Sequence, residues 1–188
     1  MALTEVRFQG GSAQSTSQAG PPWTADKAFI LGDANAWHNS RGIFPSTVWY
    51  EFPTGQRFVP GRVSFRARQD CCQDQGPTMW QFVGSNDETC DRFSHWTVLC
   101  QDLSGSGYPH RAWTKYCDVD EKINTEFRCL GISVLNTGHK DPAASLKDVR
   151  MWKKAFYWLM TKVNQIGMIN CLCVNNLTNS VGSGRHID

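Results

Sequence analysis

The side chains with the clearest capacity for chemistry in this chain are its eight cysteines. Six of them lie between Cys71 and Cys129, and none forms a CxxC pair that is followed by a second CxxC or by HxxxH, as zinc sites require. Cys171 and Cys173 are one residue apart, an unusual spacing for tetrahedral coordination from a single turn. We therefore predict disulfides and an oxidising compartment, with buried free thiols in a cytosolic domain as the alternative.

The first pairing to consider joins cysteines that are close in sequence. Cys90 and Cys100 flank Trp96 on one strand connection, and Cys117 and Cys129 flank another. We predict these two pairs, although spacing alone leaves other pairings open.

Histidines and catalytic motifs give no indication of an enzyme. The chain has five histidines, all far apart in sequence: His38, His95, His110, His139 and His186. It contains no GxSxG, no HExxH and no phosphate-cradling glycine-rich loop. We therefore predict a non-catalytic protein.

Charge and composition limit the classes of binding partner that the chain is expected to have. The 19 basic and 17 acidic residues are interspersed and leave a net charge of +2. No block of like charge resembles a nucleic-acid-binding arm or a polybasic membrane signal, so we expect no nucleic-acid partner. Eight Trp and ten Phe suggest a β-rich core with aromatic residues left over for recognition loops.

The start and the apolar content of the chain bear on its location. The first residues, MALTEVRFQGG, carry Glu5 and Arg7 and lack the apolar stretch of a signal peptide. Because this conflicts with the disulfide prediction, we interpret the sequence as a fragment of a longer secreted protein. No segment reaches the roughly 18 apolar residues that a membrane-spanning helix needs.

Short alternating segments predict the elements that position these residues. In residues 62–68, Val63 and Phe65 alternate with polar residues, as in a half-buried strand. Four further strands are expected at residues 48–52, 78–83, 95–99 and 128–135. Glycine, proline, asparagine and aspartate turns between them favour a sandwich or a barrel. One helical turn is expected after Pro22, with Thr24 as its N-cap.

Two longer stretches resemble a known family. They are FRARQDCCQDQGPTMWQFVGSNDETCDRFSHWTVL (residues 65–99) and FRCLGISVLNTGHKDPAASLKDVRMW (residues 127–152). An arginine-bearing strand, a Gly-Ser-Asn-Asp turn with a tryptophan, an aromatic-Arg-x-Leu strand and a closing Ser-Leu-x-acid-aliphatic-Arg strand occur in the family's order. The chain thus resembles the discoidin domain (coagulation factor V/VIII type C domain) of the galactose-binding-like superfamily.

The resemblance implies an all-β fold, an antiparallel jelly-roll β-sandwich of about eight strands, over residues 1–152. Residues 153–188 would be a tail outside the domain, disordered or forming a short helix. The family binds ligands through loops at one end of the sandwich and does no catalysis. The resemblance also implies that Trp37 packs in the core.

The resemblance places the ligand-binding loops at residues 17–24, 38–47 and 69–77. The candidate ligand-binding residues on them or beside them are Trp23, His38, Arg41, Phe44, Arg68 and Gln73. An aromatic ring stacks on the apolar face of a sugar, while guanidinium, imidazole and amide groups bond its hydroxyls. An extracellular, lectin-like glycan-binding function is therefore expected.

Other functions remain open for the same residues. Trp23 and Phe44 could insert between lipid head groups while Arg41 meets anionic lipid, which would give a cell-adhesion or phospholipid-binding module. An intracellular protein-interaction domain of a larger complex is a third class. Structural roles are the alternatives for single residues: Arg68 as a buried arginine paired with a carboxylate, His38 as a turn cap and Phe44 as a loop anchor.

Many relatives also hold a structural calcium ion near the helical turn. They use an Ala-x-Asp-Gly motif and a carboxylate on the last strand, where this chain has Asp148. Ile30 stands where the family has its aspartate, which argues against the ion. Asp33 or Asn35 is the candidate substitute, because calcium accepts flexible oxygen geometry.

Overall fold

A computed structural model of the protein describes residues 2–40, 42–68, 75–106, 116–137 and 143–155. Contacts within the chain separate Met1–Lys154 from Ala155–Asp188, and all described strands belong to the first unit. The predicted tail therefore lies almost entirely outside the described residues. Within the described ranges, no helix has both the length and the apolarity needed to cross a membrane.

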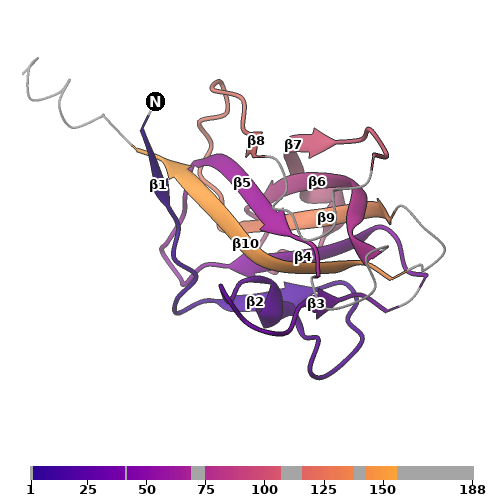
Figure 1. Cartoon of the computed structure of the whole chain (residues 1–188). Helices are drawn as coiled ribbons and strands as arrows, with labels where there is room; N and C mark the ends of the chain where they lie inside the picture. The colour runs from indigo at the N-terminus through magenta and orange to yellow at the C-terminus, as the bar shows by residue number, and fades with distance from the viewer. Residues whose placement is uncertain (1, 41, 69–74, 107–115, 138–142, 156–188) are drawn as a thin grey trace, which may run out of the picture. The chain divides into compact units, whose positions relative to one another are not determined.

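Two antiparallel sheets make up this unit (Figure 1). The first contains β1 (Leu3–Glu5), β10 (Ser145–Lys154), β5 (Pro60–Arg66) and β8 (Cys117–Asp118), in that order, with β3 (Trp37–His38) paired to β10. The second contains β2 (Ser12–Ser15), β4 (Ser46–Glu51), β9 (Cys129–Thr137), β6 (Pro77–Ser85) and β7 (Thr97–Asp102), in that order. Two 3-10 turns, η1 (Ala25–Ala28) and η3 (Phe93–His95), complete the described elements. The predicted all-β sandwich is confirmed.

The core lies between the two sheets and follows the alternation predicted from the sequence. Val63 and Phe65 of β5 are fully buried, and so are the inward residues of β9, Ile132 and Val134. The ring of Phe65 meets that of Trp80 in β6 edge to face, with 4.8 Å between centroids. Because β5 and β6 belong to different sheets, this contact joins the two layers.

Trp37 is also fully buried, as expected, and its Nε1 donates to the carbonyl oxygen of Ser17 at 3.2 Å. One strand boundary was predicted wrongly: His95 belongs to η3, and β7 begins only at Thr97. Thr24 is the N-cap of η1, as predicted, and its hydroxyl donates to the side chain of Asp26. This hydroxyl makes no side-chain hydrogen bond to a backbone N–H of the turn.

The four predicted cysteines form disulfides, but the predicted pairing was wrong. Cys90 is bonded to Cys129, and Cys100 to Cys117, with Cα–Cα distances of 6.4 and 6.1 Å. The sheet register explains the first pair: Cys129 lies opposite Ser85 at the end of β6, and the loop that follows β6 carries Cys90. The second pair joins the edge strands β7 and β8 of different sheets. Proximity in sequence did not predict either partner.

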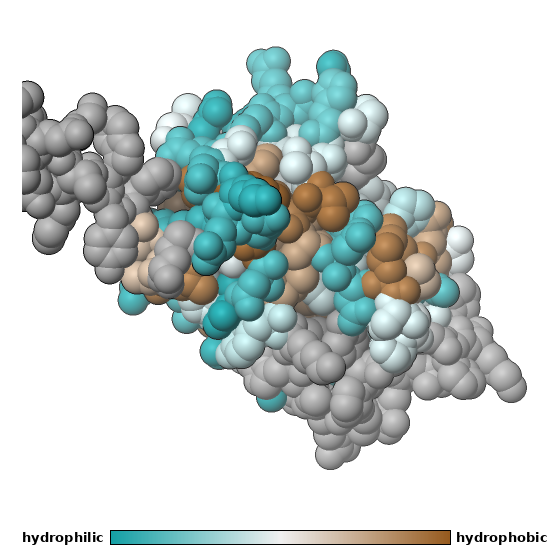
Figure 2. Space-filling model, turned by 90° about the horizontal axis from the view of Figure 1, so that it is seen from above, coloured by the Kyte–Doolittle hydropathy of each residue, from teal (hydrophilic) through white to brown (hydrophobic). Residues whose placement is uncertain are grey.

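Exposed hydrophobic side chains do not form one continuous surface on the face shown in Figure 2, where brown patches are separated by hydrophilic residues. The large hydrophobic residues that are exposed in the described part are Ile30, Leu31, Ile43, Val98, Leu103 and Tyr116. They come from several different segments, and only Ile30 and Leu31 are adjacent in sequence.

Candidate functional site

A cavity of about 470 Å³ gathers side chains from five separate segments. We call it the Trp23 cavity. The segments are the loop before η1, strand β3 with the residues after it, the residues that follow β5, and those that precede β6 and β10. Its lining consists of Ala19, Trp23, His38, Asn39, Ser40, Arg68, Gln75 and Ala143.

The aromatic wall of this cavity is held by backbone hydrogen bonds. The N–H of Trp23 donates to Gly20 O at 2.8 Å across a tight turn, and the N–H of Ala19 donates to His38 O at 2.9 Å. The half-buried indole of Trp23 lies 5.8 Å from the imidazole of His38, measured between ring centroids. The guanidinium carbon of Arg68 lies 5.9 Å from the centroid of the indole. An aromatic surface and a cation are therefore presented together.

Arg68 and His38 are in direct contact. Nη1 of Arg68 lies 3.0 Å from Nε2 of His38. A guanidinium only donates, so Nε2 is the acceptor in this contact. His38 thereby orients the guanidinium at the mouth of the cavity. Its backbone lies in β3 and its side chain is buried.

Asn39 ties the floor of the cavity to the neighbouring segments. It is almost fully buried, and its Nδ2 donates to Ile43 O at 2.9 Å. Its Oδ1 accepts from the backbone N–H of Ala144 at 2.6 Å. The N–H of Ser40 in turn donates to Ser17 Oγ at 2.8 Å. These bonds satisfy the buried polar groups and hold the cavity in one shape.

Three of the predicted ligand-binding residues, Trp23, His38 and Arg68, meet in this cavity. Phe44 does not line it: its half-buried ring packs against the hydrophobic core, as in a loop anchor. An aromatic side chain beside a core gains more by burial than by exposure, which explains this difference. Arg41 and Gln73 lie outside the described residues.

Sequence reasoning did not single out the other lining residues. Ala19, Asn39, Ser40 and Gln75 lie within the loops that were expected to form the site, so their position was the available signal. Ala143 precedes β10 and carried no signal at all.

No protein-family model matches the chain, and no curated protein matches it. Among solved structures, a family 32 carbohydrate-binding module from Clostridium perfringens NanJ, in complex with galactose, has a TM-score of 0.60 at 13% identity and covers 81% of this chain and 100% of that one. The chain has the fold of a family 32 carbohydrate-binding module.

Two further modules share this fold. CpGH89CBM32-5 of Clostridium perfringens, in complex with GalNAc-β-1,3-galactose, has a TM-score of 0.60 at 13% identity and covers 79% of this chain and 99% of that one. Chitosan-binding module 2 from a chitosanase/glucanase of Paenibacillus sp. IK-5, in complex with chitotriose, has a TM-score of 0.60 at 17% identity. It covers 78% of this chain and 98% of its own. The galactose-binding-like fold is thus shown, and the narrower assignment to discoidin domains stays a prediction.

The two candidate calcium ligands, Asp33 and Asp148, already have partners within the chain. Asp148 lies in a bulge of β10 and is nearly fully buried. Its Oδ1 accepts from the N–H of Gly32 at 2.6 Å, and its Oδ2 lies 3.3 Å from Nη1 of Arg66. A guanidinium thus contacts the carboxylate that a calcium ion would need.

Asp33 is surrounded by cations in the same way. Its carboxylate accepts from the N–H of Asn35 at 2.9 Å and from Nζ of Lys27 at 3.1 Å, and these bonds hold the pKa of Asp33 below its ordinary value. The bond to Asp33 likewise raises the pKa of Lys27. Nζ of Lys147 donates to the carbonyl oxygen of Asp33 at 2.6 Å.

These residues do not fit a calcium site. Calcium takes six to eight oxygen ligands, whereas the oxygens of Asp33 and Asp148 contact ammonium, guanidinium and amide groups of the chain. Among the described residues, no three His, Cys, Asp or Glu side chains are grouped so that they could hold a metal ion. Three basic side chains (Lys27, Lys147 and Arg66) stand where the ion would supply positive charge.

We expect thermal unfolding to be the same in excess EDTA and in millimolar calcium chloride. The internal cations neutralise Asp33 and Asp148 without a metal ion. A structural ion present at 100 times its Kd would add about 2.7 kcal/mol of stability, which differential scanning calorimetry resolves readily. A calcium-dependent rise in melting temperature that disappears in Asp148→Asn would show that the ion binds.

Proposed function

We propose that this chain is a non-catalytic module that binds a neutral glycan in the Trp23 cavity and acts outside the cell. One observation supports the proposal above all: Trp23, His38 and Arg68, which are distant in sequence, line the same cavity. An indole, a guanidinium and buried amide side chains in one concave site are suited to a ligand that has both apolar faces and hydroxyl groups.

The arrangement matches the surface of a pyranose ring. The indole of Trp23 offers a flat apolar face to the C–H side of the sugar. The guanidinium of Arg68 has several N–H donors for hydroxyl or ring oxygens. Because His38 already holds this guanidinium, less conformational entropy is lost when the ligand binds.

The ligands of the structurally similar modules support the same class. Their structures contain galactose, GalNAc-β-1,3-galactose and chitotriose, all of which are carbohydrates. The two disulfides support an oxidising, extracellular environment.

The test is a binding screen with the full chain. We expect binding to immobilised neutral glycans, including galactosides and chito-oligosaccharides, that changes little between low and high salt. Anionic phosphatidylserine vesicles, sedimented in parallel, should leave the protein in the supernatant. Binding to vesicles alone that falls with rising salt would contradict the proposal and favour a membrane-surface module. Failure to bind any glycan, together with mostly reduced cysteines in protein from its native source, would favour an intracellular interaction domain.

A further inference from the structure

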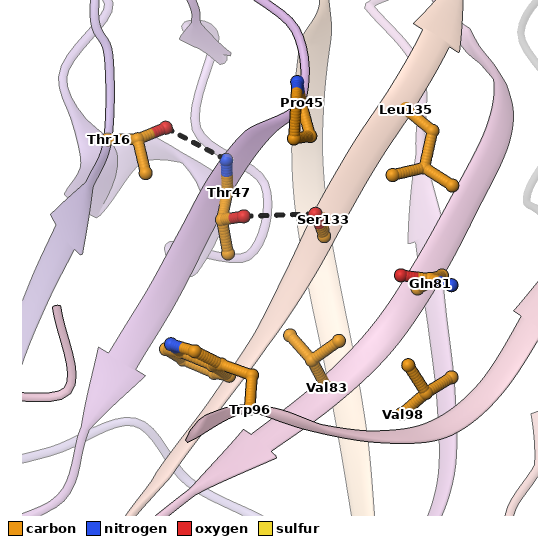
Figure 3. Close-up of a pocket in the computed structure, with 9 residues that line it drawn as sticks. All are labelled: Thr16, Pro45, Thr47, Gln81, Val83, Trp96, Val98, Ser133 and Leu135. Atoms are coloured by element: carbon orange, nitrogen blue, oxygen red, sulfur yellow. Dashed lines mark hydrogen bonds between the residues drawn. The ribbon is translucent and has the colours of Figure 1, made fainter. Parts of the chain in front are cut away.

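A second hollow lies on the outer face of the sheet β2-β4-β9-β6-β7, away from the core. We call it the sheet groove, and it has a volume of about 300 Å³ (Figure 3). Its lining consists of Thr16, Pro45, Thr47, Gln81, Val83, Trp96, Val98, Ser133 and Leu135. None of these residues lines the Trp23 cavity. Alternation in β4 explains the orientation, because Val48 and Tyr50 point into the core and Thr47 therefore points outward.

Hydroxyl groups form the floor of the groove. Oγ1 of Thr47 donates to Oγ of Ser133 at 3.0 Å, and the backbone N–H of Thr47 donates to Oγ1 of Thr16 at 3.0 Å. Only one proton can lie between the Thr47 and Ser133 oxygens, so the pair has a second hydroxyl proton to donate. No acceptor for it occurs among the residues that the structure describes. Ser133 is only 9% exposed, which makes this donor a buried group directed at the groove.

Gln81 adds an acceptor to this donor. Its Nε2 donates to Oε1 of Gln101 at 2.9 Å on the neighbouring strand β7. Figure 3 shows the amide oxygen on the side of Ser133. A ligand hydroxyl in the groove could therefore accept from the Thr47–Ser133 pair and donate to Gln81.

Apolar groups line the walls. Trp96 is half-buried and is held edge to face against the buried Trp49, with 5.9 Å between centroids. The Cys90–Cys129 disulfide packs in the same cluster and fixes the loop that precedes Trp96. Figure 3 shows Trp96 on one side of the Thr47–Ser133 pair and Pro45 on the other. The aromatic wall is thus positioned before any ligand arrives.

The lining contains no ionisable side chain, and this determines the kind of ligand. A charged group would lose its hydration there without gaining a counter-charge. A purely apolar segment would leave the hydroxyl pair and the Gln81 amide without partners. We propose that the sheet groove is a second binding site, for one ring of a neutral saccharide, and that it acts independently of the Trp23 cavity.

The test is a titration of the isotope-labelled full chain, followed by NMR, with galactose and with chitotriose as probes. We expect the signals of Thr47, Ser133, Val98 and the Trp96 indole N–H to shift in a saturable manner with at least one of these sugars. Gln81→Ala should raise the Kd read from these signals at least fivefold. Gln14→Ala is the matched control, because it removes an exposed amide from β2 of the same sheet, outside the groove lining, and should leave the Kd unchanged.

Signals of Trp23 and His38, followed in the same spectra, separate this inference from the proposed function. Shifts at Trp23 and His38 alone would overturn the second site and leave the proposed function intact. Shifts in the groove alone would support the second site and contradict the proposed use of the Trp23 cavity. If glucuronate, an anionic sugar, shifts the NMR signals of the groove residues equally strongly, the assignment to neutral saccharides is overturned.

Discussion

Glycan binding by a Trp23→Ala variant should be roughly 30-fold weaker than binding by the unaltered protein. Removal of an aromatic residue at the centre of a binding site costs about 2 kcal/mol or more, and each 1.4 kcal/mol corresponds to about tenfold in Kd. The indole of Trp23 forms the apolar wall of its cavity and also faces the guanidinium of Arg68. Isothermal titration calorimetry with the best ligand from the glycan screen measures the change.

Trp152→Ala provides the matched control for this prediction. Trp152 is also half-buried, but it lies in β10 against the ring of Tyr116 and does not line the cavity. Its loss should leave the affinity unchanged, and Trp23→Phe should restore part of it. A folded Trp23→Ala protein with full affinity would rule out the cavity as the main glycan site.

Removal of the Cys90–Cys129 disulfide should have the largest effect on stability. A Cys90→Ala, Cys129→Ala double variant loses a cross-link between residues 39 positions apart, whereas Cys100 and Cys117 are 17 apart. Chain entropy in the unfolded state predicts losses of about 4 and about 3 kcal/mol for the two bonds, since the longer loop is restrained more strongly. Urea unfolding of the two double variants measures both free energies.

The two variants also differ in their local consequences. Cys90 and Cys129 pack with Trp49 and Trp96, so we expect the Trp96 indole signal to broaden or move only when this bond is absent. The Cys100→Ala, Cys117→Ala variant should keep that signal while it loses stability. Equal stability of the unaltered protein and the Cys90→Ala, Cys129→Ala variant would contradict the disulfide assignment.

Much of the fold was predictable because alternation is a local property. Val63 and Phe65 in β5, and Ile132 and Val134 in β9, point inward as their period of two requires. The four bonded cysteines were also identified correctly. Their partners were not, because each bond depends on which strands lie side by side, and strand order is not encoded in the spacing along the chain.

Single side-chain roles were harder to predict for a similar reason. Phe44, a candidate ligand contact with a loop anchor as the alternative, packs on the core and does not line the Trp23 cavity. Asp33 and Asp148 were only candidate ligands for a doubtful calcium ion, and they contact Lys27 and Arg66. In both cases the neighbour that decides the role comes from the three-dimensional packing.

By itself, then, the sequence determined short strands with a period-two core and four bonded cysteines, and its resemblance to discoidin domains pointed to the sandwich and to loop residues of which Trp23, His38 and Arg68 line one cavity. Only the tertiary structure decided the disulfide partners, the internal cations beside the acidic pair and the hydroxyl-floored groove formed by Thr47 and Ser133. These features join residues that are far apart along the chain. Their distances depend on which strands lie side by side in each sheet, and the spacing of residues along the chain does not specify that order.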